Sequence, residues 1–296
     1  MNSSRWRFFF LGGVLALGFM AAQGPDTRLE LCHITVQDKS GHPVNDLKED
    51  AFTVFENGVK QDIQFFRHGD IPVSLGLILD NSSSMWVKRS SVEAAGQALV
   101  ADFHSDDEVF VVNFDKEVYF DNPHGKDFLT DRAEILEALT RFEPRGSSAL
   151  REAMVQSIDW MKKAHKEKHL LVVVTDGVDN ASYVKLDEVT RRAQQSNVAI
   201  YAIGLLDEDK SLARDARRQL ISLAEATGGE AFFPRELADA DRIARQTARD
   251  IRSQYTIGYQ PSNKLLDGSF RQIKVTVKAA GNPTVRTRAG YYAAHK

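Results

Sequence analysis

The sequence predicts an α/β protein: a mostly parallel sheet with helices on both faces, flanked by β-rich segments. Three observations predict this class. Continuous apolar runs recur through the middle of the chain, as in strands that are buried on both faces. Segments with helical periodicity lie between these runs, and such alternation is typical of parallel sheets. Near both ends of the chain, extended runs separated by turn residues favour antiparallel strands instead.

The composition limits the class of protein. The 296 residues are 43% hydrophobic and 27% charged, which excludes a disordered polymer and a multi-span membrane protein. The 38 basic and 41 acidic side chains give a formal charge of -3, without the basic excess of a nucleic-acid binder. One cysteine, Cys32, excludes an intramolecular disulfide framework and a cysteine-rich zinc site, and we expect it to be buried on a strand.

Residues 1–23 predict an export signal or an N-terminal anchor. Arg5 and Arg7 precede an uncharged apolar run at 8–22, which is shorter than the roughly 20 residues of a membrane span. Ala22 could sit at the cleavage site, but Met20 is large for the position three before the cut, so both cleavage and retention stay open. We expect an exported protein, periplasmic or secreted, with anchoring to the membrane by an uncleaved N-terminus as the alternative.

Residues 29–68 predict an N-terminal β segment. Strands are expected at 31–36, 52–55 and 63–66. Asn57-Gly58 after Glu56 is a hairpin signal, because both residues tolerate positive φ angles. The segment is too short to bury a core alone, so it is expected to dock on another part of the chain.

Residues 72–254 predict the parallel sheet and its helices. Buried strands are expected at 73–79, 109–114, 118–120, 170–174, 198–203 and 231–233. Helices are expected at 87–104, 131–142, 149–165, 186–196, 212–226 and 237–254.

Residues 255–293 predict a C-terminal β segment. Strands are expected at 255–259 and 272–277, where apolar and polar residues alternate, and a last hairpin is expected at 285–292. We expect this segment to pack against residues 29–68, so that the two form one small antiparallel domain. Two separate β appendages are the alternative.

Polar residues directly follow two of the predicted buried strands. Asp80, Ser82 and Ser84 follow the first strand, and Asp176 follows the strand at 170–174. Between them, Ser147 and Ser148 open a helix. Ligands of parallel sheets bind beyond the carboxyl ends of the strands, where the strand order reverses. We therefore expect these three loops to meet in one site.

The residue types in these loops select a class of ligand. Hydroxyls and two carboxylates, without histidine or cysteine, suit the hard cations Mg²⁺, Mn²⁺ and Ca²⁺, and the small number of carboxylates favours Mg²⁺. Taken singly, residues 82–84 could cap a helix and Asp176-Gly177 could be an ordinary turn. The presence of all three motifs in this order along the chain, each after the expected kind of element, favours a metal site over these alternatives. The nearby Arg145 and Asp179 are interpreted as surface charges in solvent.

These residues resemble a known family. Asp80-x-Ser82-x-Ser84, the hydroxyl of Ser148 and Thr175-Asp176-Gly177 together resemble the metal-ion-dependent adhesion site of von Willebrand factor type A (VWA) domains, and the resemblance covers about residues 72–250. The flanking segments resemble those of a bacterial subgroup of exported VWA proteins. The stretches that carry this second resemblance are Val36-x-Asp38, Phe52-x-Val54-Phe55-Glu56-x-Gly58 and Tyr255…Gly258-Tyr259-x-Pro261.

The resemblance implies a Rossmann-like, doubly wound fold with a divalent cation at the top of the sheet. The implied metal ligands are Asp80, Ser82, Ser84, Ser148 and Asp176. The family usually has threonine at the position of Ser148, and serine is less restrained in its rotamer, so whether Ser147 or Ser148 binds the metal stays open. The resemblance also implies that a carboxylate of a partner protein takes the open position on the metal.

The function expected from the sequence is a divalent-cation-dependent protein-binding module, without enzymatic activity. The chain contains no Gly-x-Ser-x-Gly elbow, no His-Glu-x-x-His and no phosphate-binding glycine loop. A hydrolase that uses the metal or a serine is one alternative. An envelope structural protein, whose metal only stabilises the fold, is another. No nucleic acid is expected among the partners, and the sequence leaves the oligomeric state open.

Overall fold

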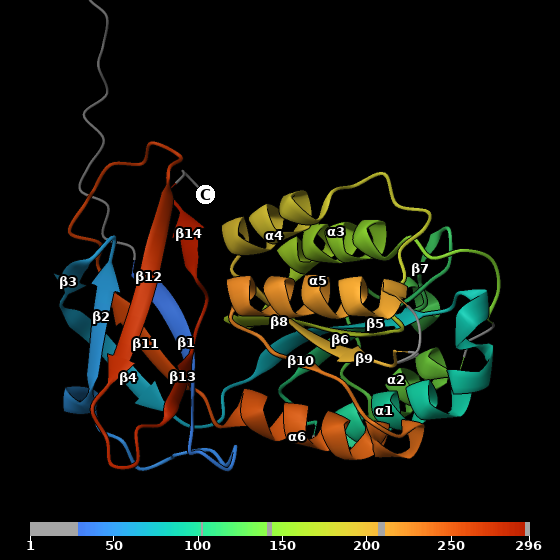
Figure 1. The fold of residues 1–296 in the computed structure, drawn as a ribbon, viewed down its shortest axis with the longest axis horizontal. Helices are drawn as coiled ribbons and strands as arrows, with labels where there is room; N and C mark the ends of the chain where they lie inside the picture. Colours follow the sequence, from blue (N-terminus) through green and yellow to red (C-terminus); the bar gives the residue numbers. More distant parts are fainter. Residues whose placement is uncertain (1–28, 102, 141–143, 207–210, 294–296) are drawn as a thin grey trace, which may run out of the picture.

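The computed structural model describes residues 29–101, 103–140, 144–206 and 211–293 (Figure 1). The predicted export signal at residues 1–23 lies outside this part of the chain. The described residues form two units side by side, an α/β unit and a β unit. None of the helices in the described ranges is long and apolar enough to cross a membrane.

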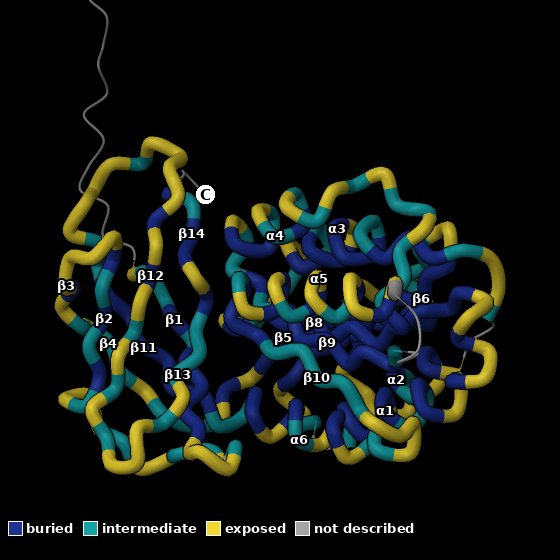
Figure 2. The backbone as a smooth tube through the Cα atoms, in the orientation of Figure 1, coloured by how far each residue is buried: buried dark blue, intermediate teal, exposed yellow. Residues whose placement is uncertain are grey.

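The α/β unit is built on a central sheet. Within the described residues this sheet has six strands in the order β10-β9-β8-β5-β6-β7, parallel except for β7. The strands are β5 (Val73–Asp80), β6 (Glu108–Phe114), β7 (Val118–Phe120), β8 (Lys168–Thr175), β9 (Val198–Gly204) and β10 (Ala231–Phe232). All residues of β5 and β6 are buried, in agreement with their largely apolar sequences (Figure 2). The predicted mostly parallel sheet is confirmed.

Helices cover both faces of this sheet (Figure 1). One hydrophobic core joins one face to α1 (Arg89–Ala101), α2 (Arg132–Leu139) and α6 (Ala240–Arg252). A second core joins the other face to α3 (Leu150–Trp160), α4 (Leu186–Gln195) and α5 (Ser211–Thr227). Short 3-10 helices precede or follow several of these elements: η2 (Ser83–Lys88), η3 (Pro123–Gly125), η4 (Met161–Lys163) and η5 (Leu237–Asp239). The predicted helix at 87–104 therefore begins as η2, and the one at 237–254 begins as η5.

The strand order reverses at β5. From β5 the chain moves through α1 to β6 on one side, whereas β8 and β9 lie on the other side of β5. The carboxyl ends of β5 and β8 are neighbours, because the two strands pair in parallel up to Leu79 and Val174. This is the position at which open parallel sheets bind ligands.

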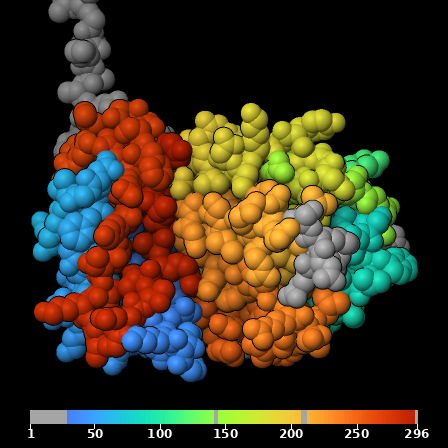
Figure 3. Space-filling view, in the orientation of Figure 1, coloured from blue at the N-terminus to red at the C-terminus, as the bar shows by residue number. Residues whose placement is uncertain are grey.

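The two terminal segments form one β unit (Figure 3). Among the described residues, two four-stranded antiparallel sheets have the orders β13-β1-β11-β4 and β14-β12-β2-β3. Their strands are β1 (Glu30–Gln37), β2 (Phe52–Glu56), β3 (Val59–Gln61), β4 (Ile63–His68), β11 (Tyr255–Tyr259), β12 (Phe270–Val277), β13 (Thr284–Arg286) and β14 (Gly290–Tyr292), and η1 (Glu49–Ala51) precedes β2. Residues of both sheets share one core, which includes the buried Cys32. The expected small antiparallel unit is confirmed, and separate appendages are not found.

Two details of the β unit differ from the sequence prediction. The expected hairpin at 285–292 is wrong: β13 pairs with β1 and β14 pairs with β12, so the two strands enter different sheets. The predicted turn after Glu56 is present, with positive φ angles at Asn57 and Gly58, and it leads into β3, which was not predicted. β3 is three residues long and mostly exposed, so its sequence carries little apolar signal.

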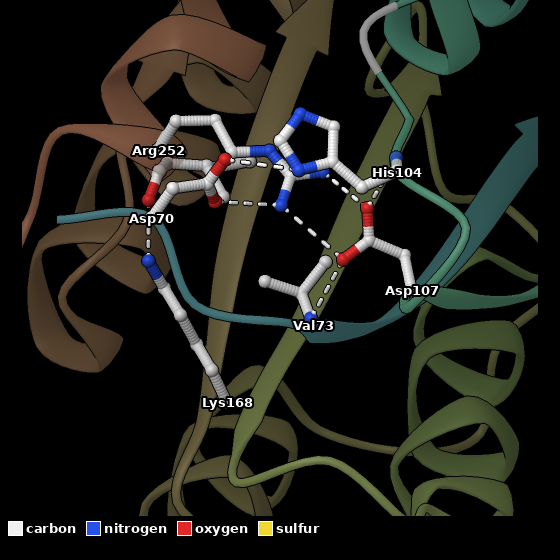
Figure 4. Close-up of polar contacts among 7 residues, drawn as sticks. Asp70, Val73, His104, Asp107, Lys168 and Arg252 are labelled. Carbon is white, nitrogen blue, oxygen red and sulfur yellow. Dashed lines mark hydrogen bonds and ion pairs between the residues drawn. The ribbon is translucent and has the colours of Figure 1, made fainter.

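The chain crosses between the two units through neighbouring strands. It leaves the β unit after β4 and returns in β11, and Tyr255 is paired with His68. Arg252 at the end of α6 forms ion pairs with Asp70 and Asp107, and Lys168 donates a hydrogen bond to the carbonyl of Ile251 (Figure 4). These contacts lie at the amino ends of β5 and β8, opposite the edge where the strand order places a ligand.

Candidate metal centre

Three loops meet at the carboxyl edge of the central sheet. The chain from Asn81 leads into η2, Gly146 lies in the loop before α3, and Asp176 directly follows β8. The amide of Ser83 donates to the carbonyl of Gly146 at 3.0 Å, and the amide of Arg145 donates to the carbonyl of Asn81 at 2.7 Å. These backbone bonds hold the first two loops together.

Hydroxyl groups and one carboxylate line a pocket of about 260 Å³ between these loops. Its lining residues are Ser82, Ser83, Ser84, Gly146, Ser147, Ser148, Asp176, Val178, Asn180, Leu212 and Ala213. Four of the five predicted metal ligands therefore lie in one pocket. The fifth, Asp80, ends β5 and is fully buried.

Asp80 accepts hydrogen bonds from the first loop and from the end of β8. One carboxylate oxygen, Oδ1, accepts from the amide of Ser82 at 2.9 Å, and Oδ2 accepts from the hydroxyl of Thr175 at 2.6 Å. Burial raises the pKa of Asp80 to about 6, and the nearby Asp176 carboxylate adds to the rise, against the hydrogen bonds that lower it. The geometry fixes the carboxylate at the base of the loops. Thr175 is part of the sequence motif, but the sequence does not predict this hydrogen bond.

The serine hydroxyls are close together and incompletely paired. The Oγ atoms of Ser82 and Ser84 are 3.2 Å apart. Ser148 is fixed through its backbone, because its amide donates to Oδ1 of Asn180 at 2.8 Å and its carbonyl accepts from the amides of Asn180 and Ala181. Its Oγ is buried and has no hydrogen-bond partner among the described residues. A buried hydroxyl without a partner is costly, and a bound cation would satisfy it.

Asp176 is positioned by a tight turn at the end of β8. Its Oδ1 accepts from the amide of Val178 at 3.1 Å. Gly177 adopts a φ of +73°, and a Cβ there would lie 2.8 Å from the Cβ of Ala216, so the turn requires glycine. The glycine of Thr175-Asp176-Gly177 therefore allows α5 to approach the candidate site.

Lys88 is a charged neighbour of the site that the sequence analysis missed. It ends η2 and is only 3% exposed, and its Nζ lies 3.7 Å from Oδ2 of Asp176, a residue that is 4% exposed. A lysine in a loop or short helix after a strand normally lies at the solvated surface, so its residue type does not mark it as buried.

Both charges predicted to lie at the surface form ion pairs, and of the two only Arg145 is exposed as predicted. Arg145 lies beside Asp115, with Nε 3.0 Å from Oδ2, although its own side chain is largely exposed. The side chain of Asp179 is only 5% exposed, and Nε of Arg151 lies 3.1 Å from its Oδ2. This pair anchors the loop after Asp176 to the first turn of α3. The prediction that Asp179 is a solvated loop acid is therefore wrong, because α3 supplies its partner.

The donor set determines which ligands fit the pocket. No group of three or more histidine, cysteine, aspartate or glutamate side chains gathers as a metal site within the described ranges. The pocket instead combines neutral hydroxyl oxygens with Asp176 above the buried Asp80. Oxygen donors of this kind suit a hard divalent cation that keeps some of its water. The unpartnered Oγ of Ser148 fits the same ligand.

The fold is similar to those of several solved structures. A von Willebrand factor type A protein from Catenulispora acidiphila is 15% identical, with a TM-score of 0.55 over 83% of this chain and 75% of that one. Proximal thread matrix protein 1 from the mussel byssus is 14% identical, with a TM-score of 0.53 over 67% of this chain and 51% of that one. The von Willebrand factor domain of the type V pili tip protein Mfa5 from Porphyromonas gingivalis is 14% identical, with a TM-score of 0.48 over 62% of this chain and 97% of that one.

The sequence comparisons assign the family. No curated protein matches the chain significantly. The model of the von Willebrand factor type A domain family matches residues 75–246, which is more than half of the 296-residue chain and includes all three loops of the pocket. The chain therefore belongs to the von Willebrand factor type A domain family.

Proposed function

We propose that this protein is a divalent-cation-dependent protein-binding module without enzymatic activity. The proposed ligands are Asp80, Ser82, Ser84, Ser148 and Asp176, and the proposed cation is Mg²⁺, with Mn²⁺ and Ca²⁺ as alternatives. The observation that carries the proposal is the buried, unpartnered Oγ of Ser148 in a pocket shared with three of the other ligands. Ser148 is favoured over Ser147 because its oxygen lacks a partner.

Each residue has a separate role in the proposed site. A bound divalent cation would supply an electrophilic point for a carboxylate oxygen of the partner. Ser82, Ser84 and Ser148 contribute neutral oxygens, which leave positive charge to attract that carboxylate. Asp80 orients the first loop by accepting from the amide of Ser82, and Thr175 fixes Asp80 in turn. The remaining part of the pocket leaves room for the partner side chain.

Exposed apolar side chains on the same loops support a protein as the partner. Trp86 and Val87 lie in η2, the element that also contains Ser84, and both are largely exposed. Leu212 lines the pocket and is also exposed, as is Tyr183 beyond Asn180. Large apolar side chains around a polar centre are typical of protein–protein interfaces. The family itself is one of protein-binding modules, which agrees with this surface.

The hydrolase alternative has less support. A serine nucleophile needs a general base within hydrogen-bond reach. The residues that line the pocket in the described chain include no histidine, and their one carboxylate, Asp176, accepts from a backbone amide and pairs with Lys88. A structural protein of the cell envelope, in which the cation only joins the three loops, is a separate candidate function. Carboxylate binding distinguishes it from the proposed module.

The proposal places the module in an exported protein. Residues 1–23 would direct export or anchor the chain, and residues 72–254 would form the binding domain. Residues 29–68 and 255–293 would form the β domain that carries it. The shared core of the two terminal segments supports this division.

Cation titration tests the proposed site. We expect isothermal titration with Mg²⁺ and Mn²⁺ to show one site in the wild type. Asp80→Ala and Ser148→Ala should weaken it by about tenfold or more, because each removes an oxygen or its support. Ser147→Ala is the matched control and should bind like the wild type. Full affinity in both Asp80→Ala and Ser148→Ala would contradict the assignment.

A carboxylate probe separates capture from a purely structural cation. N-acetyl-aspartate amide is titrated into the protein with Mg²⁺ and with EDTA, and amide chemical shifts are followed by NMR. Capture predicts saturable shifts around the pocket with Mg²⁺ alone, at an affinity on the order of millimolar for so small a ligand. N-acetyl-asparagine amide, which lacks the charge, is the control. Cation-dependent stability without carboxylate binding would favour the structural alternative.

A further inference from the structure

We propose that Lys88 is an internal counter-cation of the candidate metal centre, which competes with the divalent cation for Asp176 and so sets its affinity. This inference rests on the proposed function and names a regulator of the same site. Lys88 ends η2, the element that also carries Ser84, and its side chain is 3% exposed. Lysine is rarely buried this far unless its charge is paired.

The position of Lys88 is fixed by the packing of η2. Met85, in the same short helix, is fully buried in the core that α1 and α6 share with the sheet. The amide of Met85 donates to the carbonyl of Ser82 at 3.0 Å, which ties the helix to the loop. Because η2 is anchored in this way, Lys88 and Ser84 are carried on one short, fixed element.

The ammonium of Lys88 lies beside one carboxylate oxygen of Asp176, a proposed ligand. Oδ1 of Asp176 already accepts from the amide of Val178, whereas Oδ2 lies 3.7 Å from Nζ of Lys88. A divalent cation on Oδ2 would therefore share this oxygen with a positive charge. Two cations on one buried oxygen repel each other strongly, because little water screens them.

The other basic side chains near the pocket have different partners. Arg145 pairs with Asp115, and Arg151 pairs with Asp179. Neither Asp115 nor Asp179 belongs to the proposed ligands. Lys88 pairs with a proposed ligand, so it is placed to oppose the binding of a cation directly.

The pair has a consequence for each state of the site. Without a divalent cation, Lys88 offsets the negative charge of Asp176. With the cation bound, Lys88 adds positive charge, which weakens cation binding and strengthens the attraction for an anion. A carboxylate from the partner relieves that excess. Cation and carboxylate are therefore expected to bind cooperatively, each raising the affinity of the other.

The test compares variants that keep or remove this charge. Lys88→Met keeps the length of the side chain without its charge, and Lys88→Gln is a polar second choice if the first does not fold. We expect either to bind Mg²⁺ and Mn²⁺ about tenfold more tightly than the wild type in isothermal titration, with less enhancement by acetate. Lys88→Arg should bind like the wild type. Lys116→Met, which removes an exposed charge, is the matched control.

A second measurement uses the unchanged protein. The ¹⁵N and ¹H signals of the Lys88 ammonium are followed by NMR during titration with Mg²⁺. Competition predicts that these signals shift in step with cation binding, while those of Lys116 stay constant. Unchanged or weaker cation binding by folded Lys88→Met and Lys88→Gln would overturn the inference. If Ser148→Ala still loses the cation in that case, the proposed function stands without it; if no variant binds a cation, both fail.

Discussion

The carboxylate of Asp107 is fully buried and forms an ion pair with the guanidinium of Arg252, the last residue of α6 (Figure 4). The same carboxylate accepts from the amide of Val73 at 2.9 Å and from the amide of His104 at 2.8 Å. Arg252 also contacts Asp70 at 2.9 Å. One residue pair therefore joins the end of α6 to the start of β5 and to the loop before β6.

Replacing Arg252 should destabilise the protein strongly. Arg252→Met would leave the buried carboxylate of Asp107 without its cation, and breaking a buried pair in this way costs about 3 to 5 kcal/mol. Urea denaturation measures the free energy of unfolding. The control is Arg242→Met, whose exposed pair with Asp239 should contribute less than about 1 kcal/mol. An equal decrease in the free energy of unfolding in the two variants would show that the contacts of Arg252 stabilise the protein no more than a surface ion pair does.

The stability of the protein should rise between pH 7 and pH 9 because of Lys168. Burial, aided by the charge of Arg252 and opposed by Asp70 and Asp107, lowers the pKa of Lys168 to about 7. Lysine in the unfolded chain titrates near pH 10.5, so in this range the unfolded state holds a proton that the folded state has lost. The free energy of unfolding contributed by Lys168 should therefore increase by about 2 kcal/mol.

Two variants isolate this contribution. In Lys168→Met the increase between pH 7 and pH 9 should disappear relative to the wild type, as measured by urea denaturation at several pH values. Lys162→Met, in which an exposed lysine is replaced, should follow the wild-type curve. His33 also lies within electrostatic reach of Lys168, but its pKa is far below 6.5, so it does not titrate in this range. A profile of Lys168→Met that matches the wild type would refute the prediction.

Gly76 in β5 should tolerate no side chain. A Cβ there would lie 2.4 Å from Cζ of Phe110 and 2.5 Å from Cδ2 of Leu171, in a closely packed core. Gly76→Ala should lower the free energy of unfolding by about 1 to 3 kcal/mol, which is the usual cost of overpacking. In Gly96→Ala, the nearest atom is Cδ2 of Leu139 at 3.0 Å, and the better helix propensity of alanine offsets part of the strain. We therefore expect the midpoint of thermal unfolding to fall clearly further in Gly76→Ala than in Gly96→Ala.

Thr175 should act on the candidate site through Asp80. Its hydroxyl donates to Oδ2 of Asp80 and accepts from the amide of Gly177 at 2.9 Å. Thr175→Val keeps the shape but frees the carboxylate, and we expect the Mg²⁺ affinity to fall by about tenfold, as for other partners of metal ligands. Thr190→Val, whose hydroxyl bonds only to the backbone of α4, is the control. An unchanged affinity in folded Thr175→Val would exclude Thr175 as a positioning residue.

The central strands were predictable because local sequence determines them. The runs that became β5 and β8 are almost entirely apolar, as expected of strands that are covered on both faces. The strands of the last predicted hairpin were found at nearly the expected residues, but their partners were wrong. Alternating residues indicate a strand, whereas the choice of partner depends on packing far away in the sequence. Gly290, for example, lies so close to β12 that a Cβ would be 2.2 Å from the carbonyl oxygen of Arg271.

The candidate site was predictable in part. The order of the three polar loops along the chain predicted that Ser82, Ser148 and Asp176 would meet, and the structure places them in one pocket. Their role as metal ligands stays a prediction. Lys88 was not predicted, because nothing in its local sequence distinguishes a lysine that turns inward from one that turns to solvent.

The pairing of Tyr255 with His68 makes the α/β unit an insertion between two adjacent strands of the β unit. A tensile force between the two ends of the described chain, at β1 and β14, would be borne first by the sheets that contain these strands. The polar pocket would stay unstretched until β4 and β11 separated. A protein built in this way can hold its binding surface undistorted while its ends are under mechanical load.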